Sequence, residues 1–160
     1  MPTPMGEHRF AASTGPTISA SQINSYLICP LKYRFTYVDK LPKPWKASAL
    51  AFGSAVHSAL EAWQLSRLSG EEMPIEEVQK MFLVDWEAEK AGEVRFKDDE
   101  QENTLADKGV TLLRLAVEHL REEKPEATEL PFTVDLHNPD TGEVSETKLR
   151  GVFDLLLPND

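Results

Sequence analysis

Hydrophobic residues recur with a helical period over most of the first 123 residues of the chain. In an amphipathic helix an apolar position returns about every 3.6 residues, so that one face packs on a core. The pattern predicts four main helices: from Ser19 to just before Pro30, from about Ala49 to Leu68, from Pro74 past Trp86, and from about Leu105 to Glu123. A short piece, LKYRFTYV, follows the first helix, and the lysine-rich loop DKLPKPWKAS comes after it.

The ends of these helices carry capping signals. Ser19 with Gln22 three residues later has the capping-box pattern, and Pro30 breaks the first helix. Pro74 suits the first turn of the third helix, where its missing N–H has no intrahelical partner to lose. The predicted inward positions are Leu50, Gly53, Val56, His57, Leu60, Trp63 and Leu65 in the second helix, Ile75, Val78, Met81, Phe82, Asp85 and Trp86 in the third, and Leu112, Leu113, Leu115, Ala116, Val117 and Leu120 in the fourth.

After Pro125 the period changes to two, which is typical of a strand with one buried face. TELPFTVDL alternates in this way, HNPDTGEV has the composition of a turn, and an apolar segment returns from about Val144 to Leu157. We therefore expect an α+β fold in which a helical N-terminal half packs on a long β-hairpin, because a lone hairpin is only marginally stable. Residues 1–17, which contain several Pro and Gly, are predicted to be a flexible leader, and residues 18–160 a single domain.

Composition and charge exclude several classes of protein. A chain of 160 residues with 41% apolar residues can bury one core. No run approaches the roughly 18 apolar residues of a membrane span, and no signal-peptide block is visible, so we expect a cytoplasmic protein without a membrane partner. A net charge of -10 argues against tight non-specific binding of nucleic acid, although Lys40, Lys43 and Lys46 form a local basic stretch.

Three polar residues stand where the pattern favours an apolar or indifferent residue. His57 lies among small residues of the second helix, where by itself a core histidine bonded to a neighbouring carbonyl is the ordinary explanation. Asp154, inside GVFDLLL, must face solvent, a cation or a metal, because burying an unpaired charge is costly. Glu129 opens the first strand, where it could be a plain surface residue. Converging at a sheet end, the three would suit magnesium, which takes few protein ligands and keeps water and phosphate.

The segment CPLKYRFTYV has two interpretations. Tyr33, Phe35 and Tyr37 can belong to the core, which we expect for most of them, or can form with the basic residues a surface for a single nucleic-acid strand. Cys29, the only cysteine, can form neither an internal disulfide nor a multi-cysteine site within this chain, and we expect a small buried residue there.

Three stretches occur in a defined order: ISASQINSYLICPLKYRFTYVDKLPKP, then ALAFGSAVHSALEAW, and then LRGVFDLLL, which follows a predicted strand that begins with an acid. Together they resemble the RecB-like branch of the PD-(D/E)XK nuclease superfamily, which includes the nuclease domains of helicase–nuclease recombination complexes and the CRISPR adaptation exonucleases. The likeness covers about residues 18–157. It implies a restriction-endonuclease-like core, phosphodiester hydrolysis by a metal-dependent DNA exonuclease, and a role in DNA repair.

The resemblance also implies roles for individual residues. His57 matches the motif histidine near the metal, and Asp154 matches the first metal-binding acid, so both are expected to be catalytic. Glu129 sits where many relatives place a further acid, which completes an expected magnesium or manganese site. Cys29 matches the first of four cysteines that hold a 4Fe–4S cluster in some members. The expected partners are DNA, as single strands or duplex ends contacted by Lys32, Arg34 and Lys43, and a helicase.

The sequence departs from the family pattern after Asp154. The signature continues with an acid, one residue and a lysine on the next strand, roughly ten to fifteen positions later, whereas the sequence ends at Asp160. We therefore expect an incomplete core, the N-terminal part of such a nuclease, with weak magnesium binding and no turnover by itself. The alternatives are a non-catalytic DNA-docking or protein-interaction module, and an unrelated helical protein whose His57 and Asp154 are structural. An apolar strand edge along RGVFDLLL predicts self-association, unless another part of the chain covers it.

Overall fold

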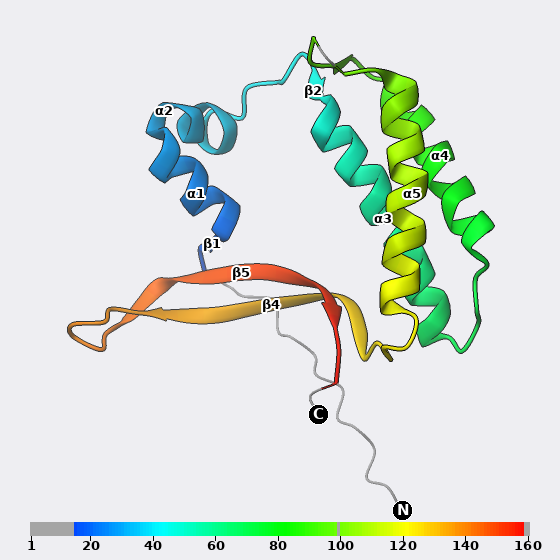
Figure 1. Cartoon of the computed structure of the whole chain (residues 1–160). Coiled ribbons are helices and arrows are strands. Elements are labelled where there is room, and N and C mark those ends of the chain that lie inside the picture. The colour runs from blue at the N-terminus through cyan, green and yellow to red at the C-terminus, as the bar shows by residue number, and fades with distance from the viewer. Residues whose placement is uncertain (1–14, 99, 159–160) are drawn as a thin grey trace, which may run out of the picture. The chain divides into compact units, whose positions relative to one another are not determined.

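The computed structural model describes residues 15–98 and 100–158 (Figure 1). The predicted leader lies mostly outside the described residues. Helices and strands are both present, so the α+β prediction is confirmed. The chain divides into two compact units, Met1–Leu41 with Leu130–Phe153, and Pro42–Glu129 with Asp154–Asp160.

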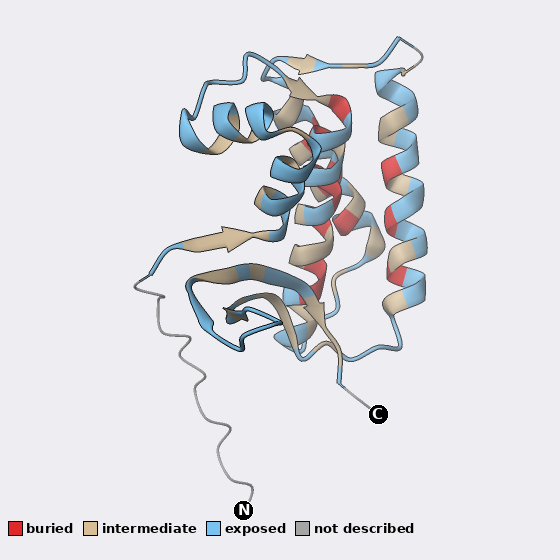
Figure 2. Ribbon diagram, turned by 90° about the vertical axis from the view of Figure 1, so that its left-hand side faces the viewer, coloured by how far each residue is buried: buried red, intermediate tan, exposed pale blue. Residues whose placement is uncertain are grey.

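The second unit is built on three helices, α3 (Ser48–Leu68), α4 (Ile75–Lys90) and α5 (Glu102–Leu120). Their facing sides hold the buried residues (Figure 2). The hydrophobic core consists of Ala51, Ala55, Val56, Ala59, Trp63, Val78, Phe82, Trp86, Leu113 and Val117. The helices approach closely where side chains are small: a Cβ added to Gly109 of α5 would lie 2.1 Å from the Phe82 ring.

The predicted inward faces are partly wrong. Leu50 and Leu65 of α3 are 61% and 47% exposed, and Leu112 and Leu115 of α5 are also exposed. In α3 the alanines take the buried positions instead, because bulky α4 side chains, Phe82 and Trp86, fill the space against Phe52 of α3 at ring distances of 5.9 and 6.2 Å. The packing face of α3 is therefore set by the size of its neighbours rather than by its own largest residues.

Two short strands lie outside the elements that the sequence predicts. β2 (Lys46–Ala47), in the predicted lysine-rich loop, pairs in parallel with β3 (Val94–Arg95), which lies between the third and fourth predicted helices. The helices that precede and follow β3 in the chain also differ slightly from the prediction, since Pro74 is the N-cap of α4 rather than its first helical residue, and α5 begins and ends three residues earlier than expected. Pairing between segments 48 residues apart leaves no local signal in the sequence.

The first unit begins with β1 (Thr17–Ser19), α1 (Ala20–Ile28), α2 (Pro30–Tyr33) and a π-helical turn, η1 (Arg34–Val38). The predicted capping box is confirmed: the Gln22 backbone N–H donates to Ser19 Oγ at 3.3 Å, and the Ser19 N–H donates to Gln22 Oε1 at 2.9 Å. None of the residues in these helices is buried in the described part of the chain.

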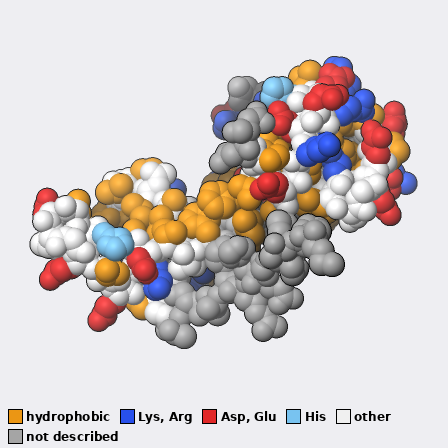
Figure 3. Space-filling model, turned by 90° about the horizontal axis from the view of Figure 1, so that it is seen from below, with side chains coloured by type: hydrophobic (Ala, Val, Ile, Leu, Met, Phe, Trp, Pro, Cys, Tyr) orange, Lys and Arg blue, Asp and Glu red, His pale blue; other side chains and the backbone are white. Residues whose placement is uncertain are grey.

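The hairpin strands, β4 (Ala127–His137) and β5 (Val144–Leu156), form a three-stranded sheet of order β1-β5-β4. β1 pairs in parallel with β5, with Thr17 opposite Lys148 and Ser19 opposite Arg150. β1 thus covers the β5 edge at Lys148–Arg150, which includes only the first residue of RGVFDLLL, and self-association through the rest of that edge stays a prediction. Hydrophobic side chains gather on the face shown in Figure 3. On the hairpin, the rings of Phe132 and Phe153 stack at a centroid distance of 4.5 Å, and Val134, Val144, Val152 and Phe153 are exposed.

Candidate metal centre

His57 lies on the solvent side of α3, and its side chain is 46% exposed. The prediction that it points into the packed face is wrong, because the alanine face of α3 meets the other helices and leaves His57 on an adjacent face. Glu61 and Gln64 follow at four and seven residues, which places them on the same side of the helix as His57. Sequence reasoning missed both residues, although this spacing was a usable signal.

Glu129 and Asp154 come from the start of β4 and the end of β5, which are neighbouring strands. The Thr128 hydroxyl donates to the backbone carbonyl of Asp154 at 2.8 Å and ties the two strands together beside the acids. Glu129 has φ of 50°, a left-handed conformation that is unfavourable for a residue with a side chain. Backbone strain of this kind concentrates at functional sites.

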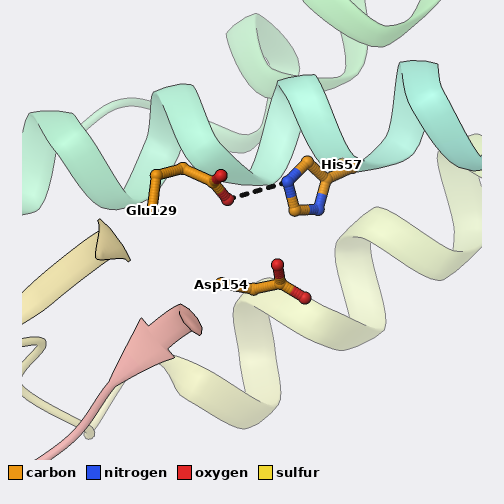
Figure 4. Close-up of side chains that lie close together, drawn as sticks. All are labelled: His57, Glu129 and Asp154. Atoms are coloured by element: carbon orange, nitrogen blue, oxygen red, sulfur yellow. Dashed lines mark hydrogen bonds and ion pairs between the residues drawn. The ribbon is translucent and has the colours of Figure 1, made fainter. Parts of the chain in front are cut away.

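The three predicted side chains come together. His57 Nε2 lies 2.8 Å from Glu129 Oε1, and ligand atoms of His57, Glu129 and Asp154 all lie within 4.8 Å of one another. Figure 4 shows their tips directed toward a common point between α3 and the strand ends. They border a pocket of about 180 Å³, lined by His57, Leu60, Glu61, Gln64, Leu120, Thr128, Glu129, Asp154 and Leu155.

The donor set fits a divalent cation. Among the described residues, the pocket lining contains three carboxylates, from Glu61, Glu129 and Asp154, and no lysine or arginine. Clustered carboxylates repel one another unless a cation lies between them. Carboxylate oxygens suit magnesium and manganese, and an imidazole nitrogen is accepted by most transition metals. His57, Glu129 and Asp154 are the residues that would hold such an ion.

The remaining predicted site residues lie elsewhere. Cys29 is a free thiol that accepts a hydrogen bond from the Lys32 backbone N–H at 3.4 Å and caps α2. Lys32, Arg34 and Lys43 are exposed, and Arg34 pairs with Asp39 at 3.1 Å. The role of Cys29 in a 4Fe–4S cluster and the roles of Lys32, Arg34 and Lys43 in DNA binding stay predictions. Tyr33 is half-buried between Tyr26 and Tyr37, whereas Phe35 is 42% exposed.

Residues 17–160 match the sequence profile of the PD-(D/E)XK nuclease superfamily. The chain belongs to this superfamily. The interpretation as an unrelated helical protein is therefore wrong, and the PD-(D/E)XK nucleases generally use divalent metals, in agreement with the donor set at His57, Glu129 and Asp154.

Two phage proteins are similar to part of the chain. The Gene 69 proteins of Mycobacterium phage L5 and Mycobacterium phage D29 are each 34% identical over 70 residues, which is 42% of this chain. The match covers 23% of the L5 protein and 24% of the D29 protein, so the chain spans about a quarter of the length of these curated relatives. No solved structure matches the chain. No helix among the described residues is long and apolar enough to cross a membrane.

Proposed function

We propose that the chain provides the metal-binding part of a RecB-type DNA exonuclease, with His57, Glu129 and Asp154 as ligands of magnesium or manganese. One observation carries the proposal: two acids from neighbouring strands and a histidine from a helix meet within 4.8 Å, and no Lys or Arg lines the pocket in the part of the chain that the structure describes. Membership of the PD-(D/E)XK nuclease superfamily supports a nuclease.

The chemistry follows from the donor set. A divalent cation at this position supplies Lewis acidity toward a phosphodiester and lowers the pKa of a water molecule. A neutral His57 that donates its Nε2–H to Glu129 is held in place on the exposed side of α3, and its Nδ1 is then the nitrogen available to a cation. Thr128, bonded to the Asp154 carbonyl, keeps the two strand ends together so that both carboxylates face the same point.

The finer parts of the proposal rest on the family resemblance. Lys32, Arg34 and Lys43 would contact the DNA backbone, a helicase would be the partner in DNA repair, and the enzyme would act in the cytoplasm. No acid-x-lysine pair follows Asp154 among the 160 residues. We therefore propose that the 160-residue chain binds the cation weakly and does not cleave DNA at a measurable rate by itself.

Manganese binding to the 160-residue chain tests the proposal. Electron paramagnetic resonance should show one weak Mn²⁺ site that magnesium displaces and that the double variant Glu129→Gln, Asp154→Asn lacks. A cleavage assay on linear DNA in the same buffer should show no activity above that of the double variant. Absence of Mn²⁺ binding would overturn the metal-centre proposal and favour the non-catalytic DNA-docking module.

A further inference from the structure

A buried amide forms part of the pocket that holds the three proposed ligands. Gln64 of α3 is only 4% exposed, and it lines the pocket together with His57, Glu129 and Asp154. Among the described residues, Gln64 and Ser48 are the two buried polar side chains. Gln64 takes no part in the metal-ligand set, so its burial beside the pocket needs a separate explanation.

The orientation of the Gln64 amide follows from its neighbour. Arg67 Nη1 donates to Gln64 Oε1 at 3.1 Å. A guanidinium has only donors, so the amide oxygen must face Arg67, and the NH₂ group occupies the other position of the amide plane. None of the hydrogen bonds within residues 15–98 and 100–158 is donated by this NH₂ group, and it is not one of the fully buried atoms that lack a partner there.

Arg67 is itself held in place, so it can keep this orientation. Its guanidinium donates to the backbone carbonyls of Leu120 at 3.1 Å and Arg121 at 3.0 Å, and it also bonds the carbonyl of Glu123. The guanidinium carbon lies 4.6 Å above the Trp63 ring. These contacts fasten Arg67 to the C-terminal end of α5, and they leave the Gln64 oxygen with one fixed donor.

The other side chains of the pocket offer mainly acceptors. Three of them are carboxylates, the Thr128 hydroxyl already donates to the Asp154 carbonyl, and His57 is bonded to Glu129. The Gln64 NH₂ group is a donor in a pocket wall that otherwise offers acceptors, so it is suited to an occupant that brings an acceptor oxygen. A carboxylate-rich pocket admits an anionic oxygen only together with a cation.

We propose that the Gln64 amide binds a non-bridging phosphate oxygen of a phosphodiester while a divalent cation occupies the site formed by His57, Glu129 and Asp154. This inference rests on the proposed function, since it requires the cation. Gln64 is then a substrate-binding residue, and Arg67 is a positioning residue that turns the donor side of the amide toward the substrate.

Two substitutions at Gln64 separate substrate binding from a structural role. Gln64→Met removes both the donor and the bond to Arg67 with little change in volume. Gln64→Glu keeps an acceptor for Arg67 but replaces the donor by a carboxylate oxygen. If Gln64 is only structural, Gln64→Glu should keep the DNA affinity of the parent chain because its bond to Arg67 remains, and only Gln64→Met should be affected. If Gln64 binds substrate, both variants should lose DNA affinity. Gln79→Met is the matched control. Gln79 lies on α4, outside the pocket, and its amide NH₂ group donates to the Val110 carbonyl at 3.0 Å.

The measurement is the Mn²⁺-dependent binding of a fluorescein-labelled 12-nucleotide single-stranded DNA to the 160-residue chain at low salt, followed by anisotropy. Mn²⁺ affinity is measured separately by paramagnetic resonance. We expect Gln64→Met and Gln64→Glu each to weaken DNA binding about tenfold or more, the effect of losing one hydrogen bond to a charged oxygen, while Gln64→Met and Gln79→Met leave Mn²⁺ affinity within about twofold, since neither is a ligand.

The outcomes distinguish this inference from the proposed function. If Mn²⁺ binding is normal and either Gln64→Met or Gln64→Glu keeps the DNA affinity of the parent chain, the role of Gln64 is overturned and the proposed function is not. The role of Gln64 is also overturned if the parent chain binds Mn²⁺ but shows no Mn²⁺-dependent DNA binding. Loss of Mn²⁺ binding in the parent chain would overturn the proposed function and this inference with it.

Discussion

Acidic residues occur in two different settings along β4 and β5. In the middle of the hairpin, Asp135 Oδ1 meets Lys148 Nζ at 2.9 Å, and the hydrogen bond from Lys148 lowers the pKa of Asp135. At the start of β4 and the end of β5, Glu129 and Asp154 meet each other and His57, with no Lys or Arg among the described residues that line the pocket. The same two strands thus carry an acid paired with a lysine and a pair of acids for which the proposed function supplies a cation as counter-charge.

The largest difference between the two settings should appear in metal affinity. Asp154→Asn is expected to weaken Mn²⁺ binding by at least about 100-fold, because even the loss of an outer-shell partner costs about 10–100-fold. Asp135→Asn removes an acid from the same hairpin and should leave the affinity unchanged. Paramagnetic resonance titrations of both variants test this, and equal effects would show that the chain binds Mn²⁺ diffusely.

A smaller effect is expected at the helix-borne ligand. His57→Ala should lower Mn²⁺ affinity about tenfold or more while leaving the free energy of unfolding within about 1 kcal/mol, because exposed pairs such as His57 with Glu129 contribute little to stability. Isothermal titration with Mn²⁺ and chemical denaturation measure the two quantities. A strongly destabilised variant with normal metal binding would identify His57 as structural.

Backbone strain at Glu129 gives a third prediction. Glu129→Asn should raise the free energy of unfolding by about 1 kcal/mol, because asparagine tolerates the left-handed conformation better, and should weaken metal binding. Lys40 also has φ of 50° but lies outside the pocket, so Lys40→Asn is the control. It should stabilise the protein similarly and leave Mn²⁺ affinity intact; a loss of stability in Glu129→Asn would contradict the strain argument.

Asp154 itself should contribute little to folding. Asp154→Asn is expected to change the free energy of unfolding by less than about 1 kcal/mol, or to raise it slightly, because the acid is exposed and its removal relieves repulsion from Glu129. An aspartate in a buried ion pair would instead cost about 3–5 kcal/mol. Thermal melts without metal measure the effect, and a loss of that size would assign Asp154 a structural role.

The smallest expected effect is the pH dependence of stability that the Asp135–Lys148 pair contributes. The folded-state pKa of Asp135 is lowered, so its pairing stabilises the protein above the unfolded-state pKa of about 3.9 and is lost as the pH falls through the lower, folded-state pKa. Carbon-13 titration of the Asp135 carboxyl group should show this shift. In Lys148→Met the shift should disappear, and its persistence would mean that another group causes it.

The amino-acid sequence by itself determined the local elements of this protein. The capping box at Ser19 and Gln22 involves groups three residues apart, and the strand alternation after Pro125 is set within one segment. The motif pattern also pointed to His57 and Asp154, which the fold brings together with Glu129. Short-range hydrogen bonds and hydrophobic periodicity depend on near neighbours in the chain, so one sequence suffices to read them.

Tertiary structure alone decided which faces are buried and which segments pair. Leu50 and Leu65 are exposed and Ala51, Ala55 and Ala59 of α3 are buried, because burial depends on the side chains that another helix presents. β1 pairs with β5 although Thr17 and Lys148 are 131 residues apart, and the sequence carries no local signal for such a contact. The orientation of the Gln64 amide likewise depends on Arg67 being fastened to the end of α5. Contacts between distant segments are set by packing and chain closure, which no short window of sequence contains.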